Sequence, residues 1–317
     1  MIERQTGVSW QQAVAKIMLA FVVITPLASC ASLPGLDSGP PPAPTSALAP
    51  YDAAIAAAEA ENDDVLKAVR YYERGNVLFD RGDPAMAIAD YDQALILDPT
   101  NARVHNNRAL AHAALGQVDQ ALADYTEAIR IDPNYTRAYK NRLVLLEQRG
   151  DWATMADDYA TLAMLDPKNA ADYYYRQGSA RYGLRDLAGA RQAFDAALAR
   201  DPQHVDAFYE RGLVRFAEGQ ATEAIADFDA ALQLSPRAVN AYYARGLAYS
   251  ASGDHTRAIN DFTRALELKP NDAAALLGRA AAAQALGDDA RANADLDRLA
   301  SLPLDDTLRL TYELLQQ

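Results

Sequence analysis

Residues 205–238 read VDAFYERGLVRFAEGQATEAIADFDAALQLSPRA, and this stretch decides the fold because close variants of it recur along the 317-residue chain. Its proline, Pro236, belongs to a series that recurs at spacings of 34, 34, 35, 34 and 34 residues. The members of the series are Pro99, Pro133, Pro167, Pro202, Pro236 and Pro270. A fixed period of roughly 20 to 50 residues indicates an array of structural repeats, in which each unit contacts its neighbours.

Setting each proline as position 32 of a unit divides most of the chain into seven repeats. The repeats are 68–101, 102–135, 136–170, 171–204, 205–238, 239–272 and 273–303. Position 4 is bulky and position 8 is Gly or Ala in all repeats but the third, and residues four apart share one helical face. Position 15 is Gly in six repeats, which favours the left-handed conformation that ends a helix.

A second helix is predicted in the rest of each unit. In residues 205–238 it carries the small Ala224 at position 20 and the aromatic Phe228 at position 24, and Pro236 ends it because proline has no N–H to donate. Small residues at positions 8 and 20 allow the two helices to approach closely. Each unit is therefore predicted to be a helical hairpin.

This pattern resembles the tetratricopeptide repeat over residues 68 to about 303. The resemblance implies an all-α fold, a right-handed superhelical solenoid of seven hairpins whose first helices line a concave groove. Residues 304–317 are predicted to form a C-terminal capping helix, because Asp305 and Asp306 are start signals and apolar residues follow on one face. The Ala-rich residues 51–67 are predicted to form an N-terminal flanking helix.

A charge pair recurs in six of the seven repeats, with Arg at position 7 and Asp at position 23. Repeat four has Gln177 and Ala193 at these positions, so both partners are lost together. Joint loss is expected of a structural ion pair, because one partner buried alone would be costly. Two alternatives remain: the arginines could form an anion site, or the extra residue of repeat four could make Arg176 the equivalent of position 7.

Repeat three has bulky residues where the other repeats have small ones, namely Leu143 at position 8 and Met155 at position 20. Two large side chains at a close crossing must spread the helices or shift their register, unless neighbouring packing compensates for them. The sequence leaves both interpretations open.

The resemblance implies that positions 2, 5, 9, 12 and 13 of the first helix face the groove. Tyrosines at position 5 of repeats four to six suit a protein or peptide partner, although the rings could instead fill gaps between repeats. Our predicted groove residues are Tyr72, Asn76, Asn107, Tyr175, Tyr182, Tyr209, Phe216 and Tyr243. A two-carboxylate clamp of the kind found in some family members would need cations where this chain has Tyr72 and Asn141, so only part of that motif is present.

The N-terminus indicates a lipoprotein. Residues 1–29 combine Arg4 and Lys16 with a short apolar run, as a signal peptide does, and the tetrad ending at Cys30 resembles the bacterial lipobox. Residues 30–50 form an acylated cysteine and a Pro-rich tether that cannot build a core. By resemblance to the enterobacterial sorting rule, the Ala at position 31 predicts the periplasmic face of the outer membrane. A signal anchor with an incidental cysteine is the alternative.

Composition and motifs exclude several functions. The net charge of −13 opposes binding to nucleic acid, the single cysteine forbids an internal disulfide, and the four histidines have no metal-site spacing. No catalytic or phosphate-binding motif interrupts the repeats, so we expect no enzyme, no cofactor and no small-molecule substrate. We expect a lipid-anchored adaptor or scaffold of the bacterial envelope, with membrane contact through the acyl anchor only. An accessory assembly lipoprotein of a secretion or pilus machine is the alternative.

Overall fold

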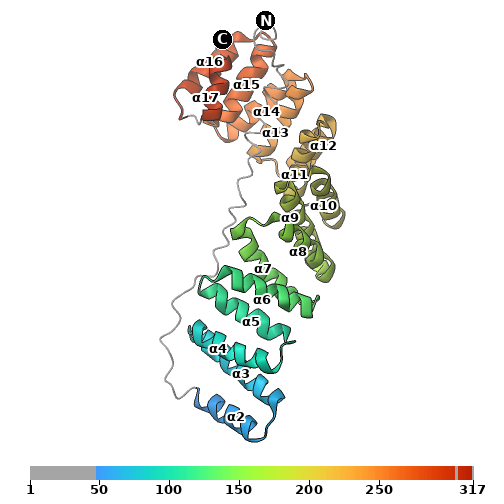
Figure 1. Cartoon of the computed structure of the whole chain (residues 1–317). Coiled ribbons are helices and arrows are strands. Elements are labelled where there is room, and N and C mark those ends of the chain that lie inside the picture. The colour runs from blue at the N-terminus through green and yellow to red at the C-terminus, as the bar shows by residue number, and fades with distance from the viewer. Residues whose placement is uncertain (1–47, 304–305, 316–317) are drawn as a thin grey trace. The chain divides into compact units, whose positions relative to one another are not determined.

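A computed structural model describes residues 48–303 and 306–315 and divides them into two compact units. We call residues 48–167 the N-terminal unit and residues 168–315 the C-terminal unit. Regular structure in the described residues is helical, without strands (Figure 1). The predicted signal peptide, Cys30 and nearly all of the predicted tether lie outside the described residues.

The N-terminal unit is a stack of antiparallel helices that begins with a single helix and continues with three hairpins. Its helices are α2 (Ala49–Ala60), α3 (Asp64–Asp80), α4 (Pro84–Leu97), α5 (Ala102–Ala114), α6 (Val118–Ile131), α7 (Thr136–Arg149) and α8 (Trp152–Leu165). Each hairpin packs against the next through its second helix, so α4 contacts α5 and α6 contacts α7.

The C-terminal unit continues the same pattern with four hairpins and a final helix. A short 3-10 helix, η3 (Pro167–Asn169), lies at the start. The α-helices are α9 (Ala170–Gly183), α10 (Leu187–Arg200), α11 (Val205–Ala217), α12 (Ala221–Leu234), α13 (Val239–Ala251), α14 (His255–Leu268), α15 (Ala273–Ala285), α16 (Asp289–Ala300) and α17 (Asp306–Leu315). The helix pairs from α3–α4 to α15–α16 match the seven predicted repeats, which confirms the all-α repeat fold.

The flanking helices differ in extent from the sequence prediction. The helix predicted over 51–67 is α2, which ends at Ala60, because the Asp63 side chain accepts a hydrogen bond from the Leu66 N–H at 2.9 Å and starts α3 there. Pro50 lies in the first turn of α2, where a missing N–H costs nothing. The capping helix predicted over 304–317 is α17, and Leu308 packs into the core of the last repeat.

Close packing within a hairpin depends on the small residue at position 8. A Cβ atom added to Gly212 of α11 would lie 2.6 Å from the Phe228 ring of α12, well inside van der Waals contact. Gly178 meets the ring of Phe194 in the same way. The pairing of a small residue at position 8 with a buried ring at position 24 therefore holds the two helices together.

Position 15 takes a left-handed conformation throughout the repeats. Gly219 has a φ of +80°, and the other five glycines at this position are similar. Repeat four has Arg185 there instead, with a φ of +63°, a conformation that side chains other than Gly rarely adopt. The turn is thus conserved in shape even where its glycine is absent.

The Arg–Asp pair of six repeats is a bidentate ion pair. The Nε and Nη2 atoms of each arginine donate to both carboxylate oxygens of its aspartate over 2.5–3.0 Å. The aspartates are buried; Asp227, for example, is 3% exposed. The pair therefore belongs to the scaffold, which excludes the anion-site interpretation for these arginines.

The third guanidinium nitrogen, Nη1, ties each repeat to the element before it. Arg211 donates through Nη1 to Asp195 of the preceding repeat at 2.6 Å, and Arg142 donates to Thr126 at 2.9 Å. Both acceptors occupy position 25. Arg108, Arg245 and Arg279 make the equivalent bonds to Asp92, Asp229 and Thr263, and Arg74 reaches Asp52 of α2.

Repeat four lacks the ion pair, as its sequence predicts. Gly178 faces the Phe194 ring as the other position-8 glycines face theirs, so Gln177 occupies position 7. Arg176 bonds instead to Asp172 on its own helix, with 2.9 Å between Nε and Oδ2. This geometry excludes the alternative alignment in which Arg176 is the equivalent of position 7.

Repeat three is the loosest hairpin of the seven. Leu143 and Met155 are both buried, and the Cα atoms of α7 and α8 approach each other less than those of any other hairpin. Of the two interpretations that its sequence allows, the structure therefore supports a rearranged crossing, in which the helices spread or shift their register, over compensated packing. The bulky side chains occupy the space that Gly or Ala leaves free elsewhere.

Candidate functional site

The first helices of the repeats form one side of each unit. In the C-terminal unit α9 contacts α11, α11 contacts α13 and α13 contacts α15, and in the N-terminal unit α3 contacts α5. Successive second helices approach each other less closely in the described residues. Since the elements of a curved stack lie closest on its inner side, the first helices line that side within each unit.

A row of tyrosines follows the first helices of the C-terminal unit at position 5. Each ring packs on the position-24 ring of its own repeat, with centroids 5.8–6.0 Å apart. The pairs are Tyr175–Phe194, Tyr209–Phe228 and Tyr243–Phe262. Tilted pairs at this spacing are favourable for aromatic rings.

The three tyrosines are only partly buried. Tyr209 packs against a core cluster that includes Ala244 and Ala248 of the next repeat, so it fills a gap between repeats. Burial raises the pKa of all three hydroxyls well above the usual value for tyrosine. The rings are thus neutral, packed in place, and partly accessible to solvent.

Position 12 contributes less surface than predicted. Tyr182 is 5% exposed and belongs to the core around Phe194. Phe216 is partly buried and packs against the cores of two successive repeats. Tyr182 therefore supports the groove from beneath, and the accessible aromatic surface consists mainly of the position-5 tyrosines.

The groove side of the N-terminal unit has amides in place of most of these rings. Asn107 donates from Nδ2 to Asn76 Oδ1 at 2.8 Å and to the Tyr72 hydroxyl at 3.2 Å. Tyr91 also donates to Asn76 Oδ1, at 2.9 Å, and Asn141 donates to Asn106 at 3.1 Å. The predicted residues Tyr72, Asn76 and Asn107 are thus brought together, but much of their hydrogen-bonding capacity is used internally.

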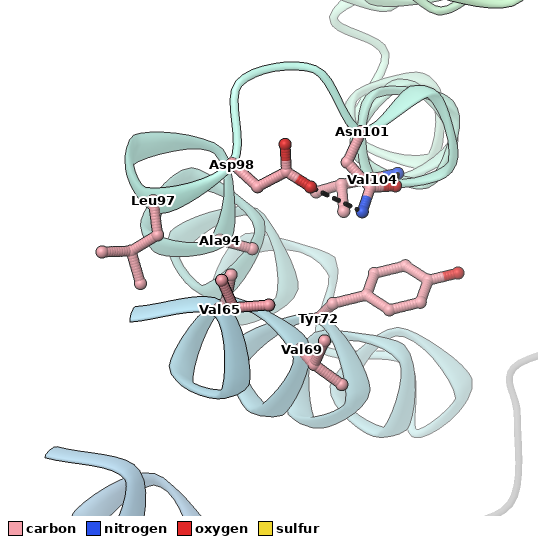
Figure 2. Close-up of a pocket in the computed structure, with 9 residues that line it drawn as sticks. Val65, Val69, Tyr72, Ala94, Leu97, Asp98, Asn101 and Val104 are labelled. Atoms are coloured by element: carbon pink, nitrogen blue, oxygen red, sulfur yellow. Dashed lines mark hydrogen bonds between the residues drawn. The ribbon is translucent and has the colours of Figure 1, made fainter. Parts of the chain in front are cut away.

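A pocket of about 220 Å³ lies beside this network, between α3, α4 and the start of α5. Figure 2 shows Val65 and Val69 on the α3 side and the Asp98 carboxylate bonded to Asn101 on the other. Val65 is 78% exposed. Sequence reasoning missed this pocket because Val65 precedes the first predicted repeat, although its spacing of four from Val69 places both on one helical face.

Glu210 is the second feature that the sequence did not reveal. It occupies position 6 of α11, is partly buried, and has a pKa raised to about 7 by burial and by the charge of Asp206. Glu73 occupies position 6 of the first repeat, where it accepts a hydrogen bond from Arg70 at 2.7 Å. The difference between these two glutamates can be found only by combining the repeat register with the surroundings of each carboxylate.

The described residues offer no metal site, since no three His, Cys, Asp or Glu side chains converge in them. His105 and His112 both approach Asp124, through Nδ1 at 3.4 Å and Nε2 at 3.8 Å, and so join the scaffold ion pair with Arg108. Burial alone would raise the pKa of Asp124, but hydrogen bonds from His105 and Arg108 hold it below its usual value. None of the described helices is both long enough and apolar enough to cross a bilayer.

Comparison with known proteins places this geometry in context. Two models of the tetratricopeptide repeat match the sequence, one at residues 72–136 and 175–239 and the other at residues 239–272. No curated protein matches the sequence significantly.

Among solved structures, the C-terminal part of a repeat-containing protein from Cytophaga hutchinsonii is similar in fold. It is 18% identical, with a TM-score of 0.58 over 76% of this chain and 98% of that one. A repeat protein from Parabacteroides merdae is 21% identical over 79% of this chain and 99% of its own, with a TM-score of 0.44. YrrB, described as having an unusual peptide-binding site, is 20% identical over 70% and 96% of the two chains, with a TM-score of 0.35.

Proposed function

We propose that this chain, which belongs to the tetratricopeptide repeat family, holds a protein or peptide partner on the first-helix side of its C-terminal unit. Proteins of this family are typically interaction scaffolds without catalytic activity. The finer proposal is that the chain is a lipid-anchored adaptor of the bacterial envelope. Its partner binds along α9, α11 and α13.

The observation that carries the proposal is the row of tyrosines at position 5. Tyr175, Tyr209 and Tyr243 come from successive first helices in the same register, and each is held by a ring beneath it. Such rings present apolar area and a hydroxyl while losing little conformational entropy on binding. A repeated, pre-organised aromatic edge suits an extended peptide or an amphipathic helix.

The anchor rests on the sequence around Cys30. If the thiol is acylated, residues 31–48 could separate α2 from the lipid surface by up to roughly 55 Å, at about 3.1 Å per extended residue. The net charge of −13 favours such a separation, because anionic headgroups repel an acidic body. The periplasmic face of the outer membrane is the proposed location.

Site-specific photocrosslinking in cells tests the groove. Truncating the tyrosines to Ala would remove packing as well as contacts, so a photoreactive residue is better placed at the exposed Asp206 and Asn240, on the same helices. The exposed Ala226 and Gln233 on α12 provide matched control positions. We expect one partner to be captured at the first pair and not at the second; capture only from α12 would contradict the proposal.

Mass spectrometry of the captured partner separates the two envelope roles. Cell-wall hydrolases or synthases would support the adaptor, and secretin or pilus subunits would support an accessory assembly lipoprotein. The Cys30→Ala variant tests the anchor, and it should move to the soluble fraction. A variant that stays with the membranes after a salt wash would contradict lipid attachment.

A further inference from the structure

Glu210 lies beside a tyrosine of the preceding repeat. Position 6 of the N-terminal unit reaches back in this way: Asn107 bonds to the hydroxyl of Tyr72, which is at position 5 of the repeat before it. Asn141 bonds to Asn106 in the same register. In the C-terminal unit the equivalent pair is Glu210 on α11 and Tyr175 on α9, two helices that contact each other.

The charge of Glu210 acts on three phenol groups. After burial, it is the largest influence that raises the pKa of Tyr175, Tyr182 and Tyr209. Such an influence requires short separations. Glu210 is therefore near these three side chains, in agreement with the register of position 6.

No cation of the described chain offsets the charge of Glu210. It takes part in no ion pair, and the charge that acts on it most is the like charge of Asp206. The buried Asp227, by contrast, accepts from both Arg211 and Arg215. Removing a carboxylate from water without a partner is costly, and such groups are found where a ligand supplies the missing charge.

We propose that Glu210, together with the rings of Tyr175 and Tyr209, forms a subsite for a cationic side chain, lysine or arginine, of the bound partner. The inference rests on the proposed function, because it names the chemistry of a residue that the groove holds. The carboxylate pairs with the cation, and a tyrosine face within about 6 Å adds a cation–π contribution. The exposed Asp206 on the same helix has the same negative charge as Glu210 and therefore adds to the attraction for a cation.

The neighbouring repeats have no glutamate at position 6, so this subsite is expected once in the C-terminal unit. Position 6 is Ala244 in repeat six and Gly278 in repeat seven, so neither repeat has a carboxylate at the place of Glu210. Arg176, at position 6 of repeat four, bonds to Asp172. We therefore expect the partner to place one basic residue next to both α9 and α11, and apolar residues along α13.

Selection from a random 12-residue peptide library displayed on phage tests the inference on the full-length protein in detergent. Peptides recovered with the wild type should be enriched in Lys or Arg at one position. Glu210→Gln should still recover peptides but without that enrichment, and Glu223→Gln, which changes an exposed carboxylate of α12, should behave as the wild type does. Enrichment that survives in Glu210→Gln, or that is absent from the wild type, would overturn the subsite. Failure of all three proteins to select any peptide would instead refute peptide binding by the groove.

A double-mutant cycle on one selected peptide gives the size of the effect. Replacing its basic residue by norleucine should weaken binding by about tenfold in the wild type and by little in Glu210→Gln, as expected for a desolvated charge pair. Equal weakening in both proteins would place the basic residue elsewhere. The melting temperature of Glu210→Gln should be no lower than that of the wild type, because the substitution removes a charge that has no partner in the free protein.

The pH dependence provides an independent readout. Affinity for the lysine peptide should rise between pH 6 and pH 8 as Glu210 loses its proton. Tyr175 and Tyr182 stay neutral over this range, and the ring of His204 lies 4.8 Å from that of Tyr175. Glu210→Gln identifies the group responsible, because only a rise caused by Glu210 disappears in that variant. A rise that persists in Glu210→Gln would assign the effect to another group and contradict the subsite.

Discussion

The two units share one scaffold and differ in the surface that it presents. Both have the buried Arg–Asp pair, the left-handed turn and the ring at position 24. On the first helices, however, the N-terminal unit has asparagines that bond to one another, whereas the C-terminal unit has tyrosine edges and an unpaired carboxylate. The comparison teaches that scaffold and groove positions vary independently, and that a polar network satisfied within the chain has less to offer a partner.

The largest effect should come from the scaffold, equally in both units. Asp227→Ala and Asp124→Ala each leave a partly buried arginine without its bidentate carboxylate, at a cost of about 3 kcal/mol in the free energy of unfolding. Asp195→Ala removes an exposed acceptor and should cost under about 1 kcal/mol. Guanidinium denaturation followed by circular dichroism measures all three. A large loss in one unit and none in the other would show that the scaffolds are not equivalent.

A smaller effect should distinguish the two glutamates at position 6. The pKa of Glu210 in the folded state, about 7, lies above its usual value, so the folded protein holds an extra proton between about pH 4.5 and pH 7. Stability contributed by the protonated group is therefore lost as pH rises through this window, by about 2 kcal/mol. Denaturation at pH 5 and pH 8 should show the fall in wild type and in Glu73→Gln but not in Glu210→Gln. A fall retained in Glu210→Gln would assign it to another group.

Replacing Gly by Ala, or Ala by Gly, at position 8 should lower the free energy of unfolding by about 1 kcal/mol in either unit. Gly212→Ala gains helix propensity but drives a methyl group into the Phe228 ring, and overpacking costs about 1–3 kcal/mol. Ala109→Gly in the N-terminal unit loses about 1 kcal/mol of propensity with no clash to relieve. Denaturant midpoints report both changes. A stabilised Gly212→Ala would mean that Phe228 moves aside without loss of packing.

The smallest effect concerns the tyrosine hydroxyls. Tyr72→Phe removes the acceptor of the Asn107 amide and should cost about 0.5–1 kcal/mol. Tyr209→Phe should leave stability nearly unchanged while reducing the yield of partner crosslinked at Asp206. Thermal melting and crosslinking, measured side by side, would show whether hydroxyls are used internally in one unit and externally in the other. A lower melting temperature for Tyr209→Phe than for Tyr72→Phe would contradict this difference between the two units.

The fold could be predicted from sequence because its determinants repeat. The proline period located the hairpins, and the joint absence of Arg and Asp from repeat four predicted their pairing before any distance was known. The sequence could not decide how repeat three absorbs Leu143 and Met155, because spreading and compensation use the same residue types. Their outcome depends on how far neighbouring side chains can move.

The candidate site was predictable in part. The repeat register singled out Tyr175, Tyr209 and Tyr243 as candidates, and the structure places each on the ring at position 24 of its own repeat. Burial could not be read in the same way, so Tyr182 was expected at the surface although it lies in the core. Glu210 was missed because a carboxylate is unusual only when its surroundings lack a cation, and that depends on three helices at once. The predictions for Cys30 and the tether stay predictions.

The bond from each arginine to position 25 of the preceding repeat limits how such a gene can rearrange. In this sequence a repeat with Arg at position 7 has Asp or Thr at position 25 of the repeat before it, wherever the arginine occurs after another repeat. Repeat four is the one repeat that lacks the arginine and has Gln177 at position 7. The repeat before it has Ala160 at position 25. Repeat order thus obeys a pairing rule, and deletion of repeat four would place Arg211 after Ala160. Duplication and loss during evolution should therefore proceed in blocks that keep both members of each pair.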